Sequence, residues 1–124
     1  MKDRILIIDD DEDLCEGLSF ILREDGYHVM SASTAVRGTE LIDKHLFHIA
    51  LLDYKMPRMT GVDLLKRIKA KNPETKVFIV SGKPFMRDLL KKEKISHLVE
   101  GVITKPFTEN ELLAAIRGDI PAEE

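Results

Sequence analysis

The amino-acid sequence predicts a single α/β domain built as a (βα)5 doubly wound sandwich. Five short apolar segments recur along its 124 residues, and segments with helical spacing of apolar residues separate them. Three of the five are nearly continuous runs of Ile, Leu and Val, as is typical of strands buried on both faces of a parallel sheet. Strands and helices that alternate in this way form a parallel sheet with helices on both faces.

The five strands are expected at residues 4–8, 27–32, 48–53, 76–81 and 101–104. Right-handed crossovers leave few ways to connect them, and the five-stranded order 2-1-3-4-5, which is flavodoxin-like, is the expected one at this length. No linker, repeat or low-complexity tract interrupts the chain. The domain is therefore predicted to span residues 1–118, followed by a short polar tail at 119–124.

Each strand is followed by a segment whose apolar residues recur at helical spacing. Gly26 is suited to end the first helix, and Pro73 to stop the third. Thr108 and Glu111 have the spacing of a capping box and predict the start of the fifth. The apolar residues are Leu14, Leu18, Ile21 and Leu22 in the first helix, Ala35, Thr39, Ile42 and Leu46 in the second, Val62, Leu65 and Ile68 in the third, Phe85, Leu89 and Leu90 in the fourth, and Leu112, Ala115 and Ile116 in the fifth.

The composition argues against several classes of protein. A net charge of −3 is unlike that of a general nucleic-acid-binding domain, which has a basic excess. The longest apolar runs are far too short for a membrane span or a signal peptide. The single cysteine, Cys15, cannot form an internal disulfide and is expected to be a buried, inert thiol. We therefore expect a cytoplasmic protein.

Polar side chains stand at the ends of four of the predicted strands. In an open α/β sheet, ligands bind beyond the carboxyl ends of the strands, where the strand order reverses, which here is between strands one and three. The sequence therefore predicts a polar site at this edge rather than a solvated run of charges. The residues are Asp9 and Asp10 after the first strand, Asp53 at the end of the third, Ser81 at the end of the fourth and Lys105 after the fifth.

Three clustered carboxylates suit a hard divalent cation and disfavour an anion. Mg²⁺ prefers oxygen ligands, and one or two carboxylates with a carbonyl suffice to hold it. A bound cation lets a carboxylate approach a phosphoryl group, while Lys105 and Ser81 add a positive charge and a hydroxyl donor for phosphoryl oxygens. The combination is typical of phosphoryl transfer to an aspartate.

The chain resembles a response-regulator receiver domain, the phosphoacceptor module of two-component signalling, over essentially its whole length. The D-x-x-M-P-x-M-x-G stretch after an apolar strand is specific, and with the other motifs it makes a strong pattern, whereas any one alone is weak. The resemblance rests on Asp9-Asp10, on Asp53 within LLDYKMPRMTG, on Ser81-Gly82 and on Lys105-Pro106-Phe107.

The resemblance implies that Asp53 is the phosphoacceptor and takes a phosphoryl group from a phosphohistidine on a partner histidine kinase or histidine phosphotransfer protein. Asp10, Asp53 and the backbone carbonyl of Lys55 would bind Mg²⁺ directly, and Asp9 would reach it through water. A domain of this kind is regulatory rather than an enzyme, since it catalyses only its own phosphoryl transfer and autodephosphorylation.

The resemblance also implies which residues respond to phosphorylation. Lys105 would pair with Asp53 and then with the phosphoryl group, Ser81 would turn inward to a phosphoryl oxygen, and the peptide before Pro106 would be cis. The face made by the fourth helix, the fifth strand and the fifth helix would read out the state, with a homodimer on activation left open. No direct nucleic-acid binding is expected, and the chain is either a stand-alone receiver or a fragment of a longer regulator with an unknown effector.

Two features depart from the family pattern. Val102 stands three residues before the lysine, where the family usually has an aromatic switch residue in the fifth strand. The segment ISHLVEG replaces the common Gly-Ala stretch before that strand, so the fourth helix is expected to be displaced or mobile. Both leave the phosphorylation site intact and affect the readout. Lys55 and Lys83 lie two residues beyond Asp53 and Ser81, where side chains can overhang the pocket, and they are expected to affect how quickly water hydrolyses the acyl phosphate.

Three other functions fit the pattern less well. A phosphatase of the haloacid dehalogenase type would use Asp9, Asp11 and Ser81 with a later lysine, but it has a further acidic pair after that lysine, which this chain lacks. A degenerate receiver that acts as a constitutive binding module is favoured only by Val102. A dinucleotide-binding domain would need a glycine-rich turn after the first strand, and none is present.

From the sequence alone, each of two surface features is open to two interpretations. Tyr54 either covers the pocket beside Asp53 or packs against its neighbours. The basic residues of the fourth helix form either a solvated face or a docking surface for an acidic partner. These basic residues are Lys83, Arg87, Lys91, Lys92 and Lys94.

Overall fold

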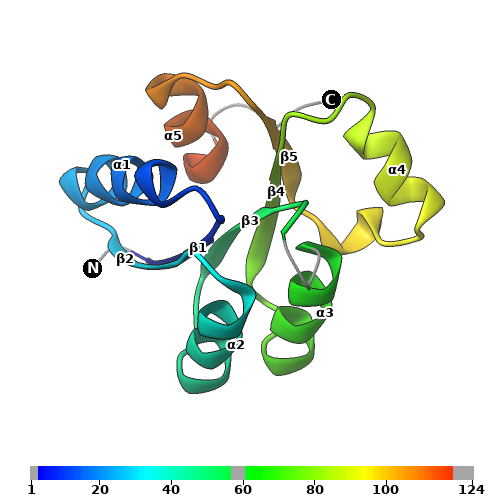
Figure 1. Cartoon of the computed structure of the whole chain (residues 1–124), viewed down its shortest axis with the longest axis horizontal. Helices are drawn as coiled ribbons and strands as arrows, with labels where there is room; N and C mark the ends of the chain where they lie inside the picture. The colour runs from blue at the N-terminus through cyan, green and yellow to red at the C-terminus, as the bar shows by residue number, and fades with distance from the viewer. Residues whose placement is uncertain (1–2, 57–60, 119–124) are drawn as a thin grey trace.

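The computed structural model describes residues 3–56 and 61–118, which fold around one five-stranded parallel sheet (Figure 1). The order of the strands is β2-β1-β3-β4-β5, and every neighbouring pair is parallel. The predicted fold class and strand order are therefore confirmed, although β2 and β3 each begin one residue later than expected. The strands are β1 (Arg4–Ile8), β2 (His28–Ala32), β3 (Ile49–Asp53), β4 (Lys76–Ser81) and β5 (Gly101–Thr104).

Helices cover both faces of the sheet. Figure 1 shows α1 and α5 on one face, and α2, α3 and α4 on the other. This doubly wound arrangement leaves the carboxyl ends of all five strands at one edge of the sheet. The helices are α1 (Glu12–Glu24), α2 (Ala35–Lys44), α3 (Gly61–Lys71), α4 (Met86–Lys92) and α5 (Glu109–Arg117), with a short 3-10 helix at Ser96–Leu98.

The alternation of side chains along β1 explains why this strand is apolar after its first residue. Ile5 and Ile7 belong to the core beneath α1 and α5, whereas Leu6 and Ile8 belong to the core beneath α2, α3 and α4. All four side chains are at most 1% exposed. Because both faces are buried, polar residues begin only where the strand ends, at Asp9.

Helix ends follow the signals in the sequence. The side chain of Asp11 accepts a hydrogen bond from the N–H of Leu14, so it caps α1 directly beside the acidic cluster. The predicted capping box of Thr108 and Glu111 is present at the start of α5. Gly26 follows α1 with a φ of 97°, a left-handed conformation that glycine adopts without steric cost.

The start of α4 differs from the prediction. The spacing in the sequence puts Phe85 on the buried face of this helix, but its side chain is 79% exposed and it precedes the first helical residue as the N-cap. Its φ of 59° is left-handed, and its side chain makes no capping hydrogen bond. Met86 and Leu90 are the buried residues of α4 instead. Phe85–Leu89 and Met86–Leu90 have the same spacing, so periodicity alone does not distinguish them.

The second helix also ends earlier than the apolar pattern suggests. Its last residue is Lys44, and Leu46 beyond it is 57% exposed rather than part of a buried face. The helix approaches β1 closely, since a Cβ at Gly38 would lie 2.7 Å from the Cδ1 of Ile8. Its buried residues are Ala35, Gly38, Leu41 and Ile42.

A helix needs about 20 apolar residues to cross the hydrocarbon core of a bilayer. In the part of the chain that the structure describes, no helix is long and apolar enough to do so, and α1 has 13 residues. The predicted tail at 119–124 lies outside the described residues.

Candidate functional site

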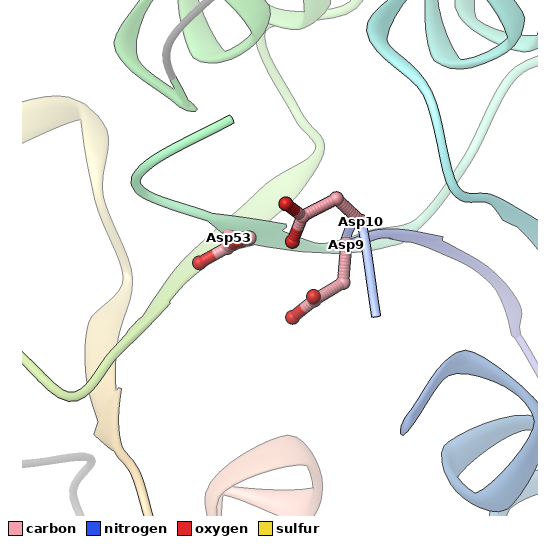
Figure 2. Close-up of side chains that lie close together, drawn as sticks. All are labelled: Asp9, Asp10 and Asp53. Carbon is pink, nitrogen blue, oxygen red and sulfur yellow. The ribbon is translucent and has the colours of Figure 1, made fainter. Parts of the chain in front are cut away.

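Three carboxylates meet where the carboxyl ends of β1 and β3 lie side by side. Asp9 and Asp10 follow β1, and Asp53 is the last residue of β3. Figure 2 shows the three side chains together, and one carboxylate oxygen from each lies within 4.8 Å of the others. Asp9 and Asp53 are buried, whereas Asp10 is exposed to solvent. The sheet order thus joins the two acidic segments to which the sequence assigns a metal site.

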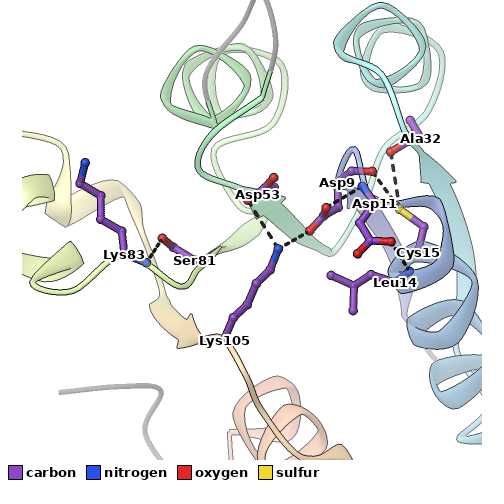
Figure 3. Close-up of polar contacts among 9 residues, drawn as sticks. All are labelled: Asp9, Asp11, Leu14, Cys15, Ala32, Asp53, Ser81, Lys83 and Lys105. Carbon is purple, nitrogen blue, oxygen red and sulfur yellow. Dashed lines mark hydrogen bonds and ion pairs between the residues drawn. The ribbon is translucent and has the colours of Figure 1, made fainter.

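Lys105 reaches this cluster from the end of β5. Its Nζ lies 3.0 Å from Oδ2 of Asp9 and 3.8 Å from Oδ1 of Asp53 (Figure 3). The N–H of Lys105 donates to the carbonyl of Ser81 at 2.8 Å, which ties the backbone of Lys105 to the end of β4. The peptide bond between Lys105 and Pro106 is cis. The resemblance implies pairing with Asp53, but the shorter contact is with Asp9. The lysine therefore bridges the two buried carboxylates.

The electrostatics of the site follow from this crowding. Burial, and after it the charge of Asp9, raise the pKa of the Asp53 carboxyl to about 6, against the lowering effect of Lys105. Burial lowers the pKa of Lys105, but the hydrogen bond to Asp9 and the nearby carboxylates outweigh it, so its pKa lies above the ordinary value. Asp53 is thus largely ionised at neutral pH, in surroundings that disfavour its charge.

The donor set fits a hard divalent cation. Three carboxylates against one ammonium leave two uncompensated negative charges in the cluster. Carboxylate oxygens are the ligands that Mg²⁺ prefers, and the ion keeps several waters of its own. The exposed Asp10 connects the buried pair with solvent. A divalent cation would therefore both find ligands here and relieve the repulsion among them.

Ser81 contributes a hydroxyl from the end of β4. The side chain is 6% exposed, and its Oγ accepts a hydrogen bond from the N–H of Lys83 at 2.9 Å (Figure 3). The register pairs Asp53 with Val80, so Ser81 stands one residue beyond the neighbour of Asp53. A hydroxyl that accepts one hydrogen bond can also donate one, which gives the site a second donor beside Lys105.

Gly61 fixes the backbone that carries Asp53. A Cβ at this position would lie 2.6 Å from the carbonyl oxygen of Asp53 and 3.0 Å from the Cα of Tyr54. The N–H of Gly61 also donates to the carbonyl of Tyr54 at 2.8 Å. This role is not predicted from the sequence, although the glycine that closes the D-x-x-M-P-x-M-x-G motif is the signal for it. Residues 57–60 of the motif lie outside the described residues.

Asp9 is held by the first turn of α1. The N–H of Asp11 donates to Oδ1 of Asp9 at 3.0 Å, and the thiol of Cys15 donates to the Asp9 carbonyl at 3.2 Å. Burial, ahead of the charge of Asp9, raises the pKa of the Cys15 thiol to about 11. The expected buried thiol is therefore confirmed, and it stays protonated at neutral pH.

The remaining predicted residues lie near the site residues in the sequence. Lys55 and Lys83 are exposed, two residues beyond Asp53 and Ser81 respectively. Val102 is 2% exposed within β5. Tyr54 is half-buried against the core, and its hydroxyl donates to Oε2 of Glu93 at 2.9 Å, a contact the sequence did not predict.

Comparison with known proteins agrees with this arrangement. A family model described as the response regulator receiver domain matches residues 5–117. The chain belongs to the response regulator receiver family. The transcriptional regulatory protein DltR of Streptococcus agalactiae is 32% identical over 114 residues, which is 92% of this receiver and 50% of that protein. The regulatory protein VanR of Enterococcus faecium is 31% identical over 123 residues, which is 97% of this receiver and 51% of that protein.

Solved receiver structures share the fold. A CheY-like response regulator receiver domain protein from Methanospirillum hungatei is 31% identical with a TM-score of 0.85, over 96% of this chain and 94% of that one. The BeF3-activated DrrB receiver domain is 27% identical with a TM-score of 0.82, over 95% of this chain and 97% of that one. The receiver spans about half the length of the curated relatives it matches. It is thus a regulatory module of two-component signalling.

Proposed function

We propose that this receiver is phosphorylated on Asp53, in an Mg²⁺-dependent reaction, by a partner histidine kinase or histidine phosphotransfer protein. The observation that carries the proposal is the position of Asp53. It is a buried carboxylate 3.8 Å from Lys105, with oxygens of Asp9 and Asp10 within metal-binding range. A nucleophile, a cation site and a fixed positive charge are thus together at the strand ends.

The hydrogen bonds of the cluster favour Asp53 over Asp9 as the phosphoacceptor. Both oxygens of Asp9 are engaged, Oδ1 by the N–H of Asp11 and Oδ2 by Lys105. Among the described residues, Lys105 lies farther from Asp53, with its Nζ 3.8 Å from Oδ1. With a pKa of about 6, Asp53 is also largely ionised at neutral pH, so it needs no general base. Asp9 is better suited to hold Lys105 and, through water, the metal ion.

In the reaction, a carboxylate oxygen of Asp53 attacks the phosphorus of a phosphohistidine, the P–N bond breaks, and its electron pair stays on the imidazole. Mg²⁺ would be held by Asp10, Asp53 and the backbone carbonyl of Lys55. When bound, it would shield the carboxylates from the phosphoryl oxygens. Lys105 and the hydroxyl of Ser81 would bind these oxygens once the acyl phosphate has formed, and so favour the product.

The acyl phosphate would then be lost by autodephosphorylation rather than by turnover of other substrates. Lys55 and Lys83 are exposed beside the site, and we assign them an influence on the access of water to the phosphoryl group. Replacing each with alanine and timing the loss of the phosphoryl group tests this. Unchanged lifetimes in both variants would remove the assignment.

The output side of the proposal follows the receiver family. The receiver domain would comprise residues 1–118, and its α4–β5–α5 face would read out the phosphorylated state, with a homodimer formed on activation as one form of readout. The effector, whether a separate protein or a fused output domain, is not assigned, and no direct nucleic-acid binding is assigned to the receiver itself. A cytoplasmic location remains part of this proposal.

The proposal is tested by intact mass spectrometry after incubation with acetyl phosphate, with and without Mg²⁺. Wild-type protein should gain one phosphoryl group only when Mg²⁺ is present, and Asp53→Asn should gain none. Asp63→Asn, an exposed aspartate on α3, serves as the matched control and should behave as the wild type. If acetyl phosphate gives no adduct, a beryllofluoride titration separates refusal of a small donor from an inactive pocket. A pocket that binds neither would contradict the proposal.

A further inference from the structure

Helix α4 is attached to the sheet by few buried groups. Of its seven residues, Met86 and Leu90 are the buried ones. Its N-cap, Phe85, makes no side-chain capping bond and has a left-handed φ of 59°. A short helix with one strained end and a narrow buried face is positioned by its end contacts as much as by its packing.

Both ends of α4 are tied to residues that flank the phosphoacceptor. Before the helix, the N–H of Lys83 donates to Oγ of Ser81 at 2.9 Å (Figure 3). After the helix, Oε2 of Glu93, its C-cap, accepts a hydrogen bond from the hydroxyl of Tyr54 at 2.9 Å. Ser81 ends β4, and Tyr54 directly follows Asp53. The two tethers therefore connect one helix with two neighbouring strand ends of the site.

The donor of the second tether is itself fixed. The N–H of Tyr54 donates to the carbonyl of Val80 at 3.2 Å, and its carbonyl accepts from the N–H of Gly61 at 2.8 Å. The ring packs against the core beneath α2, α3 and α4. Tyr54 thus belongs rigidly to the end of β3, and any displacement of α4 changes its distance to Glu93 rather than carrying the ring along.

We propose that the Tyr54–Glu93 hydrogen bond is a latch that holds α4 in its unphosphorylated position and opens when Asp53 is phosphorylated, which makes Tyr54 a positioning residue. This rests on the function proposed above. When Ser81 turns toward the phosphoryl group, the N–H of Lys83 loses its acceptor and the start of α4 is released. Because a helix of two turns moves as a unit, its far end then leaves Tyr54.

The latch connects the phosphorylation site with α4 through an aromatic side chain, which β5 of this receiver does not provide. The residue at position 102 is a buried valine, which has no ring to move between two positions. Tyr54, which directly follows β3, supplies an aromatic side chain instead, with a hydroxyl that reaches the C-cap of α4. A bond made only in the unphosphorylated state must, by linkage, oppose phosphorylation by the same factor.

Two measurements on matched variants test the latch. Hydrogen–deuterium exchange of the α4 amides is compared in the wild type, Tyr54→Phe and Glu93→Ala without added ligands. The affinity for beryllofluoride with Mg²⁺ is then measured in the same proteins. Loss of the bond should raise α4 exchange and tighten beryllofluoride binding about two- to tenfold, the range of one exposed hydrogen bond. The effects of the two substitutions should not add in the double variant.

Two further variants separate the latch from a general loss of packing. Glu93→Gln keeps an oxygen that can accept from Tyr54 and should retain slow exchange and wild-type affinity. Tyr27→Phe removes the other tyrosine hydroxyl of the chain and should leave α4 exchange unchanged.

Each outcome bears on a distinct part of the proposal. Equal α4 exchange in Tyr54→Phe and the wild type would overturn the latch and leave the proposed function standing. Faster exchange with unchanged beryllofluoride affinity would overturn its release on phosphorylation. Failure of the wild type both to bind beryllofluoride and to be phosphorylated by acetyl phosphate would remove the proposed function, and the release step with it.

Discussion

The edge of the sheet that holds the carboxyl ends of the strands has two neighbouring parts, and they differ in how tightly they are packed. At the ends of β1 and β3, the carboxylates of Asp9 and Asp53 are buried and paired with Lys105, and a Cβ at Gly61 would lie only 2.6 Å from the Asp53 carbonyl oxygen. At the end of β4 the chain leaves the edge through the exposed residues 82–85. A Cβ at Gly82 would meet nothing nearer than the Cβ of Lys105, at 3.7 Å.

The difference matches the two tasks of a receiver. Phosphoryl transfer needs charges held in place before the donor arrives, because groups that must reorganise contribute less to the reaction. A readout needs an element whose position changes at small cost in free energy, and loosely packed segments provide it. The rigid acidic site and the lightly attached α4 are therefore complementary.

Removal of Lys105 should give the largest contrast between the two regions. Lys105→Met leaves the buried Asp9 beside Asp53 without an ammonium between them. Without divalent cations, the free energy of unfolding at neutral pH should fall by about 3 kcal/mol. Lys83→Met, on the exposed segment, should change it by less than about 0.5 kcal/mol. Urea unfolding followed by circular dichroism measures both, and Mg²⁺ should restore part of the loss. Equal losses of unfolding free energy in the two variants would mean that the two regions do not differ in how much their charges contribute to stability.

Two glycines allow the packing of the regions to be compared directly. Gly61→Ala forces the backbone of Asp53 and Tyr54 to shift, so the free energy of unfolding should fall by about 2–3 kcal/mol. Gly82→Ala makes only ordinary contacts at 3.7 and 3.9 Å and should change it by less than about 0.5 kcal/mol. Thermal and urea unfolding both report these differences. A Gly61→Ala protein of wild-type stability would contradict the tight packing.

Asp53→Asn should stabilise the protein at neutral pH. The folded-state pKa of Asp53, about 6, lies above the ordinary value of 3.8, so the folded chain binds this proton more tightly than the unfolded chain does. The stability from this group is present below pH 3.8 and is lost as the pH rises through about 6. In cation-free buffer the asparagine variant should gain ~1–2 kcal/mol at neutral pH.

The pH series supplies the control for that variant. The gain of Asp53→Asn over the wild type should shrink as the pH falls toward 3.8, because both side chains are then uncharged. Urea unfolding of both proteins across this range measures the difference. A gain that does not depend on pH would mean that the charge of Asp53 is not its cause.

The smallest effect is expected at the start of α4. Phe85 has a φ of 59° and a side chain that is 79% exposed, so it bears a backbone strain without burying its ring. Phe85→Gly should raise the free energy of unfolding by about 0.5–1 kcal/mol, since glycine adopts this conformation freely. Lys94→Gly, at a φ of 62°, is a second test of the same kind. Destabilisation by Phe85→Gly would show that the exposed ring contributes contacts.

The sheet and the acidic cluster were predictable because they depend on local patterns and a general rule of topology. Buried parallel strands are apolar throughout, so the runs at 4–8, 76–81 and 101–104 mark their own boundaries. The strand order then brings together residues far apart in the sequence, such as Asp9 and Lys105. The chemistry of carboxylate and ammonium groups then predicts a cation site at this edge.

The features that were not predicted depend mainly on tertiary contacts, although the glycine that closes the D-x-x-M-P-x-M-x-G motif is a local sign of one of them. The bond between Tyr54 and Glu93 joins residues 39 positions apart; Tyr54 occupies an unspecified position of the D-x-x-M-P-x-M-x-G motif, and Glu93 belongs to no motif. The exposure of Phe85 follows from a left-handed residue at the helix start, which periodicity does not detect. The close approach of Gly61 to Asp53 follows from how α3 meets β3.

The interior position of β1 in the sheet has a consequence for protein synthesis. β1 pairs with β2 on one side and β3 on the other, so its two hydrogen-bonding edges are filled by segments made later. While the ribosome makes α1, β2 and α2, the apolar run Arg4–Ile8 has no partner on its β3 side. Exposed apolar strands of this kind are prone to aggregation and are recognised by chaperones. Until residues 49–53 have emerged, β1 of the nascent chain is therefore open to such contacts on its β3 side.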